Sequence, residues 1–325
     1  MGELYALLAA FSFACANVMV KKGAKSKTDD NGAFLSVLIT LFLAGFFVIW
    51  RGLFHGWVPL NIEGIWWFVL AGILTAFMGR TLLYTSIQHL GSVRASAIKR
   101  LNPLFAVILG ILFLHESLNI WIIAGIVLIF CSSAVLMYES LLAAKRKKKE
   151  TDDLQIPALQ EAALDEADQK QHKWFEKIKI LAGFGYLYGI ISALSYAVGY
   201  VVRKEGLEEI PDPYIGTLIG AFVGMIVFFI LSLFQKRYRR SIQSTFKRFR
   251  PWLFGAGIAT SFGQILYFAA LTQSGVSQVA VIASTDVIFT LFLSSIVFKT
   301  QEGVTSTVIF ASIAAMAGAG LIAIG

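Results

Sequence analysis

The sequence predicts an all-α membrane protein with ten transmembrane helices, built as two inverted five-helix repeats. The first observation is composition: the 325 residues are 57% hydrophobic and only 15% charged, whereas soluble domains are roughly 25% charged. The second is a series of ten apolar windows, each long enough for a helix that crosses a bilayer. The third is a similarity between the two halves of the chain. Together these features argue against a soluble globular protein.

The predicted spans follow one another with short connections, except between the fifth and the sixth. About 20 apolar residues cross the hydrocarbon core as a helix. The first window has no basic segment before it and no cleavage site after it, so we interpret it as a spanning helix and not as a signal peptide. The ten spans are predicted at residues 4–21, 33–52, 64–87, 92–114, 118–138, 184–203, 213–234, 251–273, 277–298 and 304–324.

A charged stretch divides the chain into a first repeat at 1–138 and a second repeat at 181–325. Residues 139–180 begin with the basic run AAKRKKKE and continue with the acidic run EAALDEAD. Low hydrophobicity and dense charge predict a solvated linker. From residue 159 onward the linker is rich in residues that favour helix.

The two halves match each other at a nearly constant offset. AAFSFACANVMVKKG at 9–23 aligns with SALSYAVGYVVRKEG at 192–206 without a gap, and six of the fifteen positions are identical. GRTLLYTSIQHLG at 79–91 aligns in the same way with GQILYFAALTQSG at 263–275. Each half has an odd number of predicted spans, so the second half must enter the membrane with the opposite orientation. Inverted repeats are typical of secondary transporters, which bind substrate near the midplane where the repeats meet.

Most of the net charge of +8 comes from three basic runs at 21–27, 145–149 and 236–250. With ten spans, all three runs fall on one side of the membrane, which the positive-inside rule assigns to the cytoplasm, with both termini outside. The opposite side carries mainly Arg51, Arg203 and Lys204. We interpret the runs as contacts with anionic lipid, and the sequence contains no basic motif of a folded nucleic-acid-binding module.

The stretch 91–116 is the most polar of the predicted spans, because Lys99, Arg100, Asn102 and Pro103 lie in its first half. A cation at this depth costs about 2.5–3.5 kcal/mol on insertion scales, so by default it faces protein or a water-filled cavity. The segment is therefore predicted to line a polar path. Its counterpart in the second half carries Asp286 where the first half carries Asn102.

Asp286 lies about eleven residues into its predicted span, close to the membrane midplane. One interpretation is a site that couples transport to protons or binds a substrate amine. The other is a structural ion pair with Lys99, Arg100 or Arg80. The two interpretations are compatible, because a pair that a proton or a substrate can break would act as a gate.

Arg80 and Lys99 are candidates for binding a carboxylate or a phosphate. The short turn near residue 91 makes the third and fourth spans antiparallel neighbours, so the two cations are predicted at similar depth. Arginine offers a forked donor and lysine a point charge. Lys99 and Arg100 point about 100° apart on a helix, and Lys99 shares the polar stripe with Asn102 and Pro103. Snorkelling to the nearby interface is the alternative for these cations.

Several polar side chains at membrane depth could contact a substrate, although such residues more often form hydrogen bonds between helices. They are Asn17, Tyr196, Tyr200, Gln264 and Tyr267.

The run LNPLFAVILGILFLHESL resembles an EamA-type member of the drug/metabolite transporter superfamily. The resemblance rests on Pro–Leu–Phe followed by about ten apolar residues and a glutamate, from Pro103 to Glu116, and on the five-plus-five organisation. The second half departs from the pattern, with Val287 at the proline position and Glu302 at the acidic end. The resemblance covers both membrane halves but not the linker. It implies export or exchange of small metabolites without a bound cofactor, and it does not imply one substrate. It also implies that both termini lie in the cytoplasm, the reverse of the orientation that the basic runs predict.

We therefore expect a multi-pass protein of the cell membrane that acts as a secondary active transporter of a small polar, amino-acid-like metabolite. Transport would follow alternating access, with protons as a candidate coupling ion. A nucleotide-sugar or phosphate antiporter is the alternative. A membrane enzyme is disfavoured because the sequence lacks HExxH and GxSG motifs and a pair of midplane aspartates. A channel is disfavoured because the sequence shows no loop that resembles a selectivity filter. Small residues along the last span allow close packing, within a monomer or across a homodimer.

Overall fold

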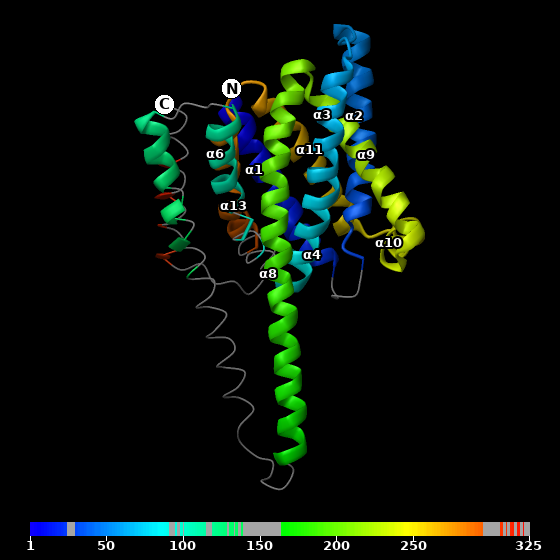
Figure 1. The fold of residues 1–325 in the computed structure, drawn as a ribbon, viewed down its shortest axis with the longest axis vertical. Coiled ribbons are helices and arrows are strands. Elements are labelled where there is room, and N and C mark those ends of the chain that lie inside the picture. The colour runs from blue at the N-terminus through cyan, green and yellow to red at the C-terminus, as the bar shows by residue number, and fades with distance from the viewer. Residues whose placement is uncertain are drawn as a thin grey trace.

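The computed structural model describes residues 1–24, 30–90, 95, 98–99, 101–114, most of 119–138, 164–294 and a few positions between 306 and 321; for 164–184 it describes the backbone alone. Within these residues every regular element is a helix (Figure 1). The first half contains α1 (Gly2–Gly23), α2 (Ala33–His55), α3 (Ile62–Ala71), the π-helix η1 (Gly72–Gly79), α4 (Arg80–Leu90) and α6 (Leu101–Leu114). The second half contains α8 (Leu164–Glu209), α9 (Pro213–Phe234), α10 (Lys236–Lys247), α11 (Pro251–Leu271), α12 (Val276–Ala283) and α13 (Asp286–Phe292).

Six helical segments within the described residues are long and apolar enough to cross a membrane. Three further apolar helices are shorter. The prediction of an all-α membrane protein is therefore confirmed, and the count of ten spans stays a prediction. The six segments are Gly2–Gly23, Ala33–His55, Ile62–Leu90, Gly185–Glu209, Pro213–Phe234 and Pro251–Leu271, and the shorter helices are Leu101–Leu114, Ile120–Ser132 and Val276–Thr290.

The helices of the two halves interdigitate. α1 packs along α11, whereas α8 packs along α3, η1 and α4, and α2 packs against α9. α1, the first helix of the first half, thus lies against α11, the third long helix of the second half. In the same way α8, the first helix of the second half, lies against α3, η1 and α4, which together form the third apolar segment of the first half. α1 starts at the end of the bundle where the N-terminus lies, and α8 enters the bundle from the opposite end (Figure 1). The two segments that match in sequence therefore run in opposite directions.

The sixth predicted span is part of a helix much longer than expected. α8 has 46 residues and begins at Leu164, inside the stretch interpreted as a linker. Its first part projects beyond the other helices (Figure 1). Hydropathy predicted only the span at 184–203, because an apolar window reports where a helix crosses lipid and not where the helix starts.

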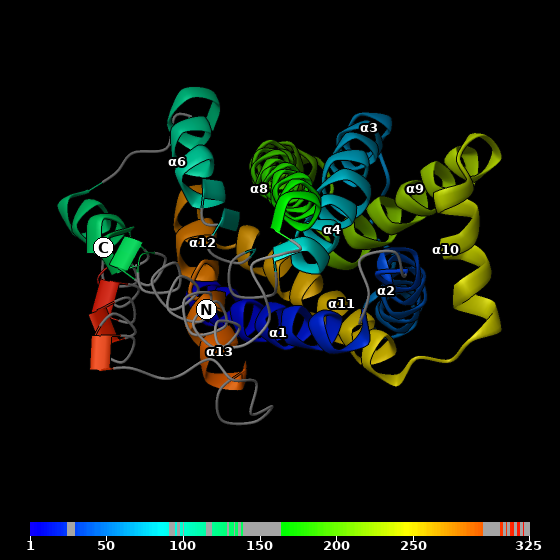
Figure 2. The ribbon, with the colours of Figure 1, turned by 90° about the horizontal axis from the view of Figure 1, so that it is seen from below.

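A small amphipathic helix lies at the edge of the bundle, near the end from which α8 projects. α10 lies beside α9 and α2 (Figures 1 and 2). Tyr238 and Ile242, one helical turn apart, are partly buried and pack against the apolar core. The ring centroid of Phe246, a further turn along, lies 6.5 Å from that of Phe34, but Phe246 is 70% exposed. The remaining surface is rich in lysine and arginine. This pattern is typical of a helix that lies at a membrane interface.

A close contact between two helices occurs at two glycines. A methyl group on Gly72 of η1 would lie 2.7 Å from the Cα atom of Gly220 in α9. A side chain at this position would therefore push the two backbones apart. Small residues at such crossings allow the close packing that holds membrane helices together.

Candidate functional site

The ninth predicted span is broken next to its acidic residue. α12 ends at Ala283, Ser284 and Thr285 form a turn, and α13 begins at Asp286. The Ser284 hydroxyl donates to the Val281 carbonyl at 2.6 Å, and the Thr285 hydroxyl donates to the Ile282 carbonyl at 2.8 Å. The same two carbonyls also accept the backbone N–H groups of Ser284 and Thr285, each at 3.1 Å, so the turn is closed by short-range bonds of the 3₁₀ type. Helices interrupted at membrane depth are typical of substrate and ion sites in transporters.

Asp286 forms a buried ion pair with Lys99. The Nζ atom of Lys99 lies 3.2 Å from Oδ2 of Asp286, and the two side chains are 13% and 3% exposed. The ammonium also lies 4.9 Å from the ring centroid of Phe13 and 5.8 Å from that of Tyr196. A cation over aromatic faces gains further electrostatic stabilisation. Of the three cations considered as partners for Asp286, the structure pairs Lys99 with it, and Arg100 lies outside the described residues.

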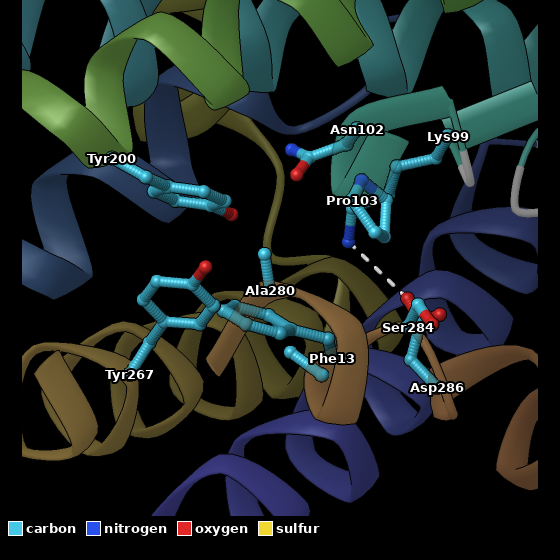
Figure 3. Close-up of a pocket in the computed structure, with 10 residues that line it drawn as sticks. Phe13, Lys99, Asn102, Pro103, Tyr200, Tyr267, Ala280, Ser284 and Asp286 are labelled. Carbon is cyan, nitrogen blue, oxygen red and sulfur yellow. Dashed lines mark hydrogen bonds and ion pairs between the residues drawn. The ribbon is translucent and has the colours of Figure 1, made fainter. Parts of the chain in front are cut away.

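A small cavity adjoins this ion pair (Figure 3). The open volume is about 20 Å³, room for roughly one water molecule. Both halves contribute walls, so the cavity lies where the two repeats meet. The lining residues are Phe13, Lys99, Asn102, Pro103, Tyr200, Tyr267, Ala280, Ala283, Ser284 and Asp286.

Two tyrosines form the wall opposite the ion pair. The rings of Tyr200 in α8 and Tyr267 in α11 stack with centroids 4.2 Å apart. Their hydroxyl groups point into the same space, and the Asn102 amide faces the Tyr200 hydroxyl (Figure 3). The cavity therefore offers a cation, a carboxylate, an amide and two hydroxyls within aromatic walls. This combination suits a small molecule with both polar and apolar parts.

Arg80 belongs to a separate buried cluster. It is fully buried and donates from Nη1 to the hydroxyls of Ser36 at 3.3 Å and Thr40 at 3.1 Å. The Thr40 hydroxyl bonds to Ser261, and Tyr84 bonds to Thr260. The predicted grouping of Arg80 with Lys99 around one cavity is not seen, because the Arg80 guanidinium faces α2.

The other predicted residues lie near the cavity without lining it. Tyr196 packs against Tyr200, with ring centroids 5.8 Å apart, and contributes a face to Lys99. Asn17 and Gln264 are buried on α1 and α11, one turn from Phe13 and Tyr267 respectively. Within the described residues no group of His, Cys, Asp and Glu could hold a metal ion.

Arg203 is a buried residue that the sequence placed wrongly. We expected it among the charges outside the membrane, but it is only 2% exposed. Its Nη2 atom donates to the Thr75 hydroxyl in η1 at 2.6 Å, and its guanidinium lies 3.7 Å from the ring centroid of Phe268. The signal was available in the sequence, since Arg203 follows Tyr196 and Tyr200 at the spacing of one helix face.

The comparison with known families decides the classification. The sequence matches the EamA-like transporter family over residues 1–138 and 183–324. The chain belongs to the EamA-like transporter family. This confirms the resemblance found in the sequence and makes the EamA-like protein an integral, multi-pass membrane protein of a transporter family.

The fold is also similar to that of a solved structure. A chain described as "Crystal structure of protein" superposes with a TM-score of 0.58 and 14% sequence identity, over 97% of this chain and 98% of that chain. At such low identity the likeness shows the fold alone. No curated protein matches the sequence.

Proposed function

We propose that this EamA-like protein is a secondary active transporter, an exporter or exchanger, of a small amino-acid-like metabolite. The observation that carries the proposal is the buried Lys99–Asp286 pair beside a cavity lined by both halves. The proposal includes ten spans in two inverted five-helix repeats. The antiparallel directions of α1 and α8 support this arrangement.

The ion pair provides a chemical basis for coupling. In the closed state each charge compensates the other, which lowers the cost of burying both. A substrate with an ammonium and a carboxylate can replace both partners at once, with its ammonium at Asp286 and its carboxylate at Lys99. A proton on Asp286 would also release Lys99. Either event removes the contact between the fourth and ninth spans, so the site can open to one side of the membrane.

The cavity of about 20 Å³ supports alternating access, since it is too small for a metabolite. The substrate can enter only after helices move apart. The aromatic walls, formed by Phe13, Tyr200 and Tyr267, would then enclose the apolar part of the substrate.

A phosphate-bearing substrate is the second candidate, favoured by two further buried cations. Among the described side chains, neither Arg80 nor Arg203 forms an ion pair, although both are buried. A buried cation without a carboxylate partner favours an anionic ligand. An antiporter that exchanges nucleotide sugars or phosphates would use this excess positive charge.

Uptake into proteoliposomes tests the proposal. A pooled, isotope-labelled library of amino acids and phosphate-bearing metabolites is supplied with and without an inward-acid pH gradient. We expect the wild type and the surface control Glu208→Gln to accumulate an amino-acid-like compound, and Asp286→Asn to lose this activity. Accumulation of phosphate compounds only would support the second candidate. Equal uptake by wild type and Asp286→Asn would contradict the assignment of the site.

A further inference from the structure

A second cavity, larger than the one beside Asp286, lies next to α10. Its volume is about 380 Å³, within the range of roughly 300–1,000 Å³ of small-molecule sites. The walls come from α4, α10, the residues Asp30 and Asn31 before α2, the start of α2 and Phe228 of α9. None of the residues that line it lines the cavity beside Asp286.

Hydrogen bonds between these elements hold the walls in place. The Nη2 atom of Arg237 in α10 donates to the Thr85 hydroxyl in α4 at 2.8 Å. The Asn31 amide donates to the same hydroxyl at 3.3 Å. The Ser241 hydroxyl donates to Asp30 Oδ1 at 2.7 Å. Three separate segments are therefore tied around one polar space.

The orientation of α10 directs a basic stripe toward this space. Tyr238 and Ile242 are partly buried and pack against the apolar core, which orients the neighbouring face of the helix. Arg237, Arg240 and Ser241, which share that face at helical spacing, all line the cavity. The arginines are thus presented by a helix that is packed on its other side.

The charged groups of the lining favour an anion. Arg237 and Arg240 contribute two positive charges and Asp30 one negative charge, so the net charge is +1 with His89 neutral. Asp30 is already engaged, because its Oδ1 accepts bonds from Ser241 and from the Gly32 amide at 3.2 Å. Arg237 uses one Nη2 bond to Thr85, and a guanidinium has five N–H donors.

A buried hydroxyl in the wall lacks a partner. The side chain of Thr81 lines the cavity, is 7% exposed, and its Oγ1 has no hydrogen-bond partner within the part of the chain that the structure describes. Buried polar groups are nearly always satisfied by protein, water or a ligand. An occupant of the cavity would satisfy this group.

We propose that this cavity binds a small anion through a carboxylate or phosphate group, which Arg237 and Arg240 hold by charge-assisted hydrogen bonds. Thr81 and Asn31 also line the cavity and contact the same ligand. The anion is either a soluble metabolite, held at this entrance before or after transport, or the headgroup phosphate of a lipid. Both sources present the same chemistry to the arginines, which suit forked recognition of such groups. The site lies beyond the proposed transport site and does not depend on it.

Binding of inorganic phosphate to the purified full-length protein in detergent, measured by calorimetry, tests the proposal. We expect Arg237→Gln and Arg240→Gln each to weaken phosphate binding by about tenfold or more, the scale of one lost charge-assisted contact. Arg239→Gln is the matched control, because Arg239 is an exposed arginine of α10 outside the lining. It should change the affinity by less than about twofold.

The background variant Asp286→Asn separates this proposal from the proposed transport function. Phosphate binding should persist in Asp286→Asn even if transport is lost. Absence of phosphate binding up to about 10 mM, or equal affinities for Arg237→Gln and Arg239→Gln, would overturn the proposal.

Nanodiscs distinguish the two sources of the anion. If lipid occupies the site, free phosphate should bind more weakly in phosphatidylglycerol discs than in phosphatidylcholine discs, and Arg237→Gln should abolish the difference. If a soluble metabolite is the natural ligand, the affinity for phosphate should be the same in both discs. Either result supports the anion site and identifies the source of its ligand.

Discussion

Loss of the ion pair between Lys99 and Asp286 should lower the free energy of unfolding, and a double-mutant cycle measures the interaction energy of the pair. At 3.2 Å the attraction between two unit charges is about 5 kcal/mol with an effective dielectric constant of 20. Solvent screening is weak because the side chains are 13% and 3% exposed. The cost of removing both charges from water offsets much of this attraction, but loss of one partner leaves the other charge buried and uncompensated. Such a loss typically costs about 3–5 kcal/mol.

We therefore expect Asp286→Asn and Lys99→Met each to lower the free energy of unfolding by about 3–5 kcal/mol. The double variant should lose less than the sum of the two, because no unpaired charge remains. Unfolding in mixed micelles of detergent and sodium dodecyl sulfate gives these free energies. Glu208→Gln and Lys21→Gln are controls that remove exposed charges from membrane helices. Additivity of the two single variants within about 0.5 kcal/mol would refute the reasoning.

Three further perturbations test other contacts. Thr75→Val removes the acceptor that Arg203 uses at 2.6 Å, so a buried N–H loses its partner and the free energy of unfolding should fall by about 1–3 kcal/mol. Gly72→Ala places a methyl group 2.7 Å from Gly220, and the forced separation of η1 and α9 should cost about 1–3 kcal/mol. Burial raises the pKa of Asp30 above its ordinary value of 3.8, so the folded protein holds this proton to higher pH than the unfolded chain does. Stability should therefore fall as pH rises from about 3.8 through the raised pKa, and Asp30→Asn should remove this dependence from melting temperatures measured across that range.

Two of these variants have a control at a residue of the same type: Thr272→Val for Thr75→Val, and Gly45→Ala for Gly72→Ala. Thr272→Val removes an exposed hydroxyl from the end of α11 and should change stability by less than about 0.5 kcal/mol. Gly45→Ala places its methyl group 3.6 Å from the nearest side-chain atom, an ordinary contact, and should be tolerated. If Gly72→Ala is as stable as Gly45→Ala, the glycine contact does not hold η1 against α9. If Thr75→Val unfolds like the wild type, Arg203 finds another acceptor.

The class of the protein could be predicted because a bilayer imposes strong constraints on sequence. A helix that crosses lipid must be apolar over about 20 residues, and that pattern is visible without a structure. The same constraint made Lys99 and Asp286 stand out, because charges in apolar segments are expensive. The family match then confirms the resemblance based on the segment around Pro103.

The partners of these residues depend on packing, which hydropathy does not report. Lys99 was one of three possible partners for Asp286, and only the crossing of the fourth and ninth spans selects it. Arg203 was assigned to the aqueous side together with Lys204, at the end of its predicted span, whereas helix rotation turns its side chain toward Phe268. The break after Ala283 had no visible signal, since serine and threonine are common in membrane helices.

The small volume beside Asp286 has a kinetic consequence. If this cavity is the proposed substrate site, its volume of about 20 Å³ admits no metabolite, so substrate would bind only to molecules in which the helices have already separated. The observed rate of substrate association should then rise with substrate concentration and level off at the rate at which the helices separate. The apparent affinity is weakened by the fraction of molecules that are open. A substitution that eases the separation of Lys99 from Asp286 would therefore tighten substrate binding even where it touches no substrate atom.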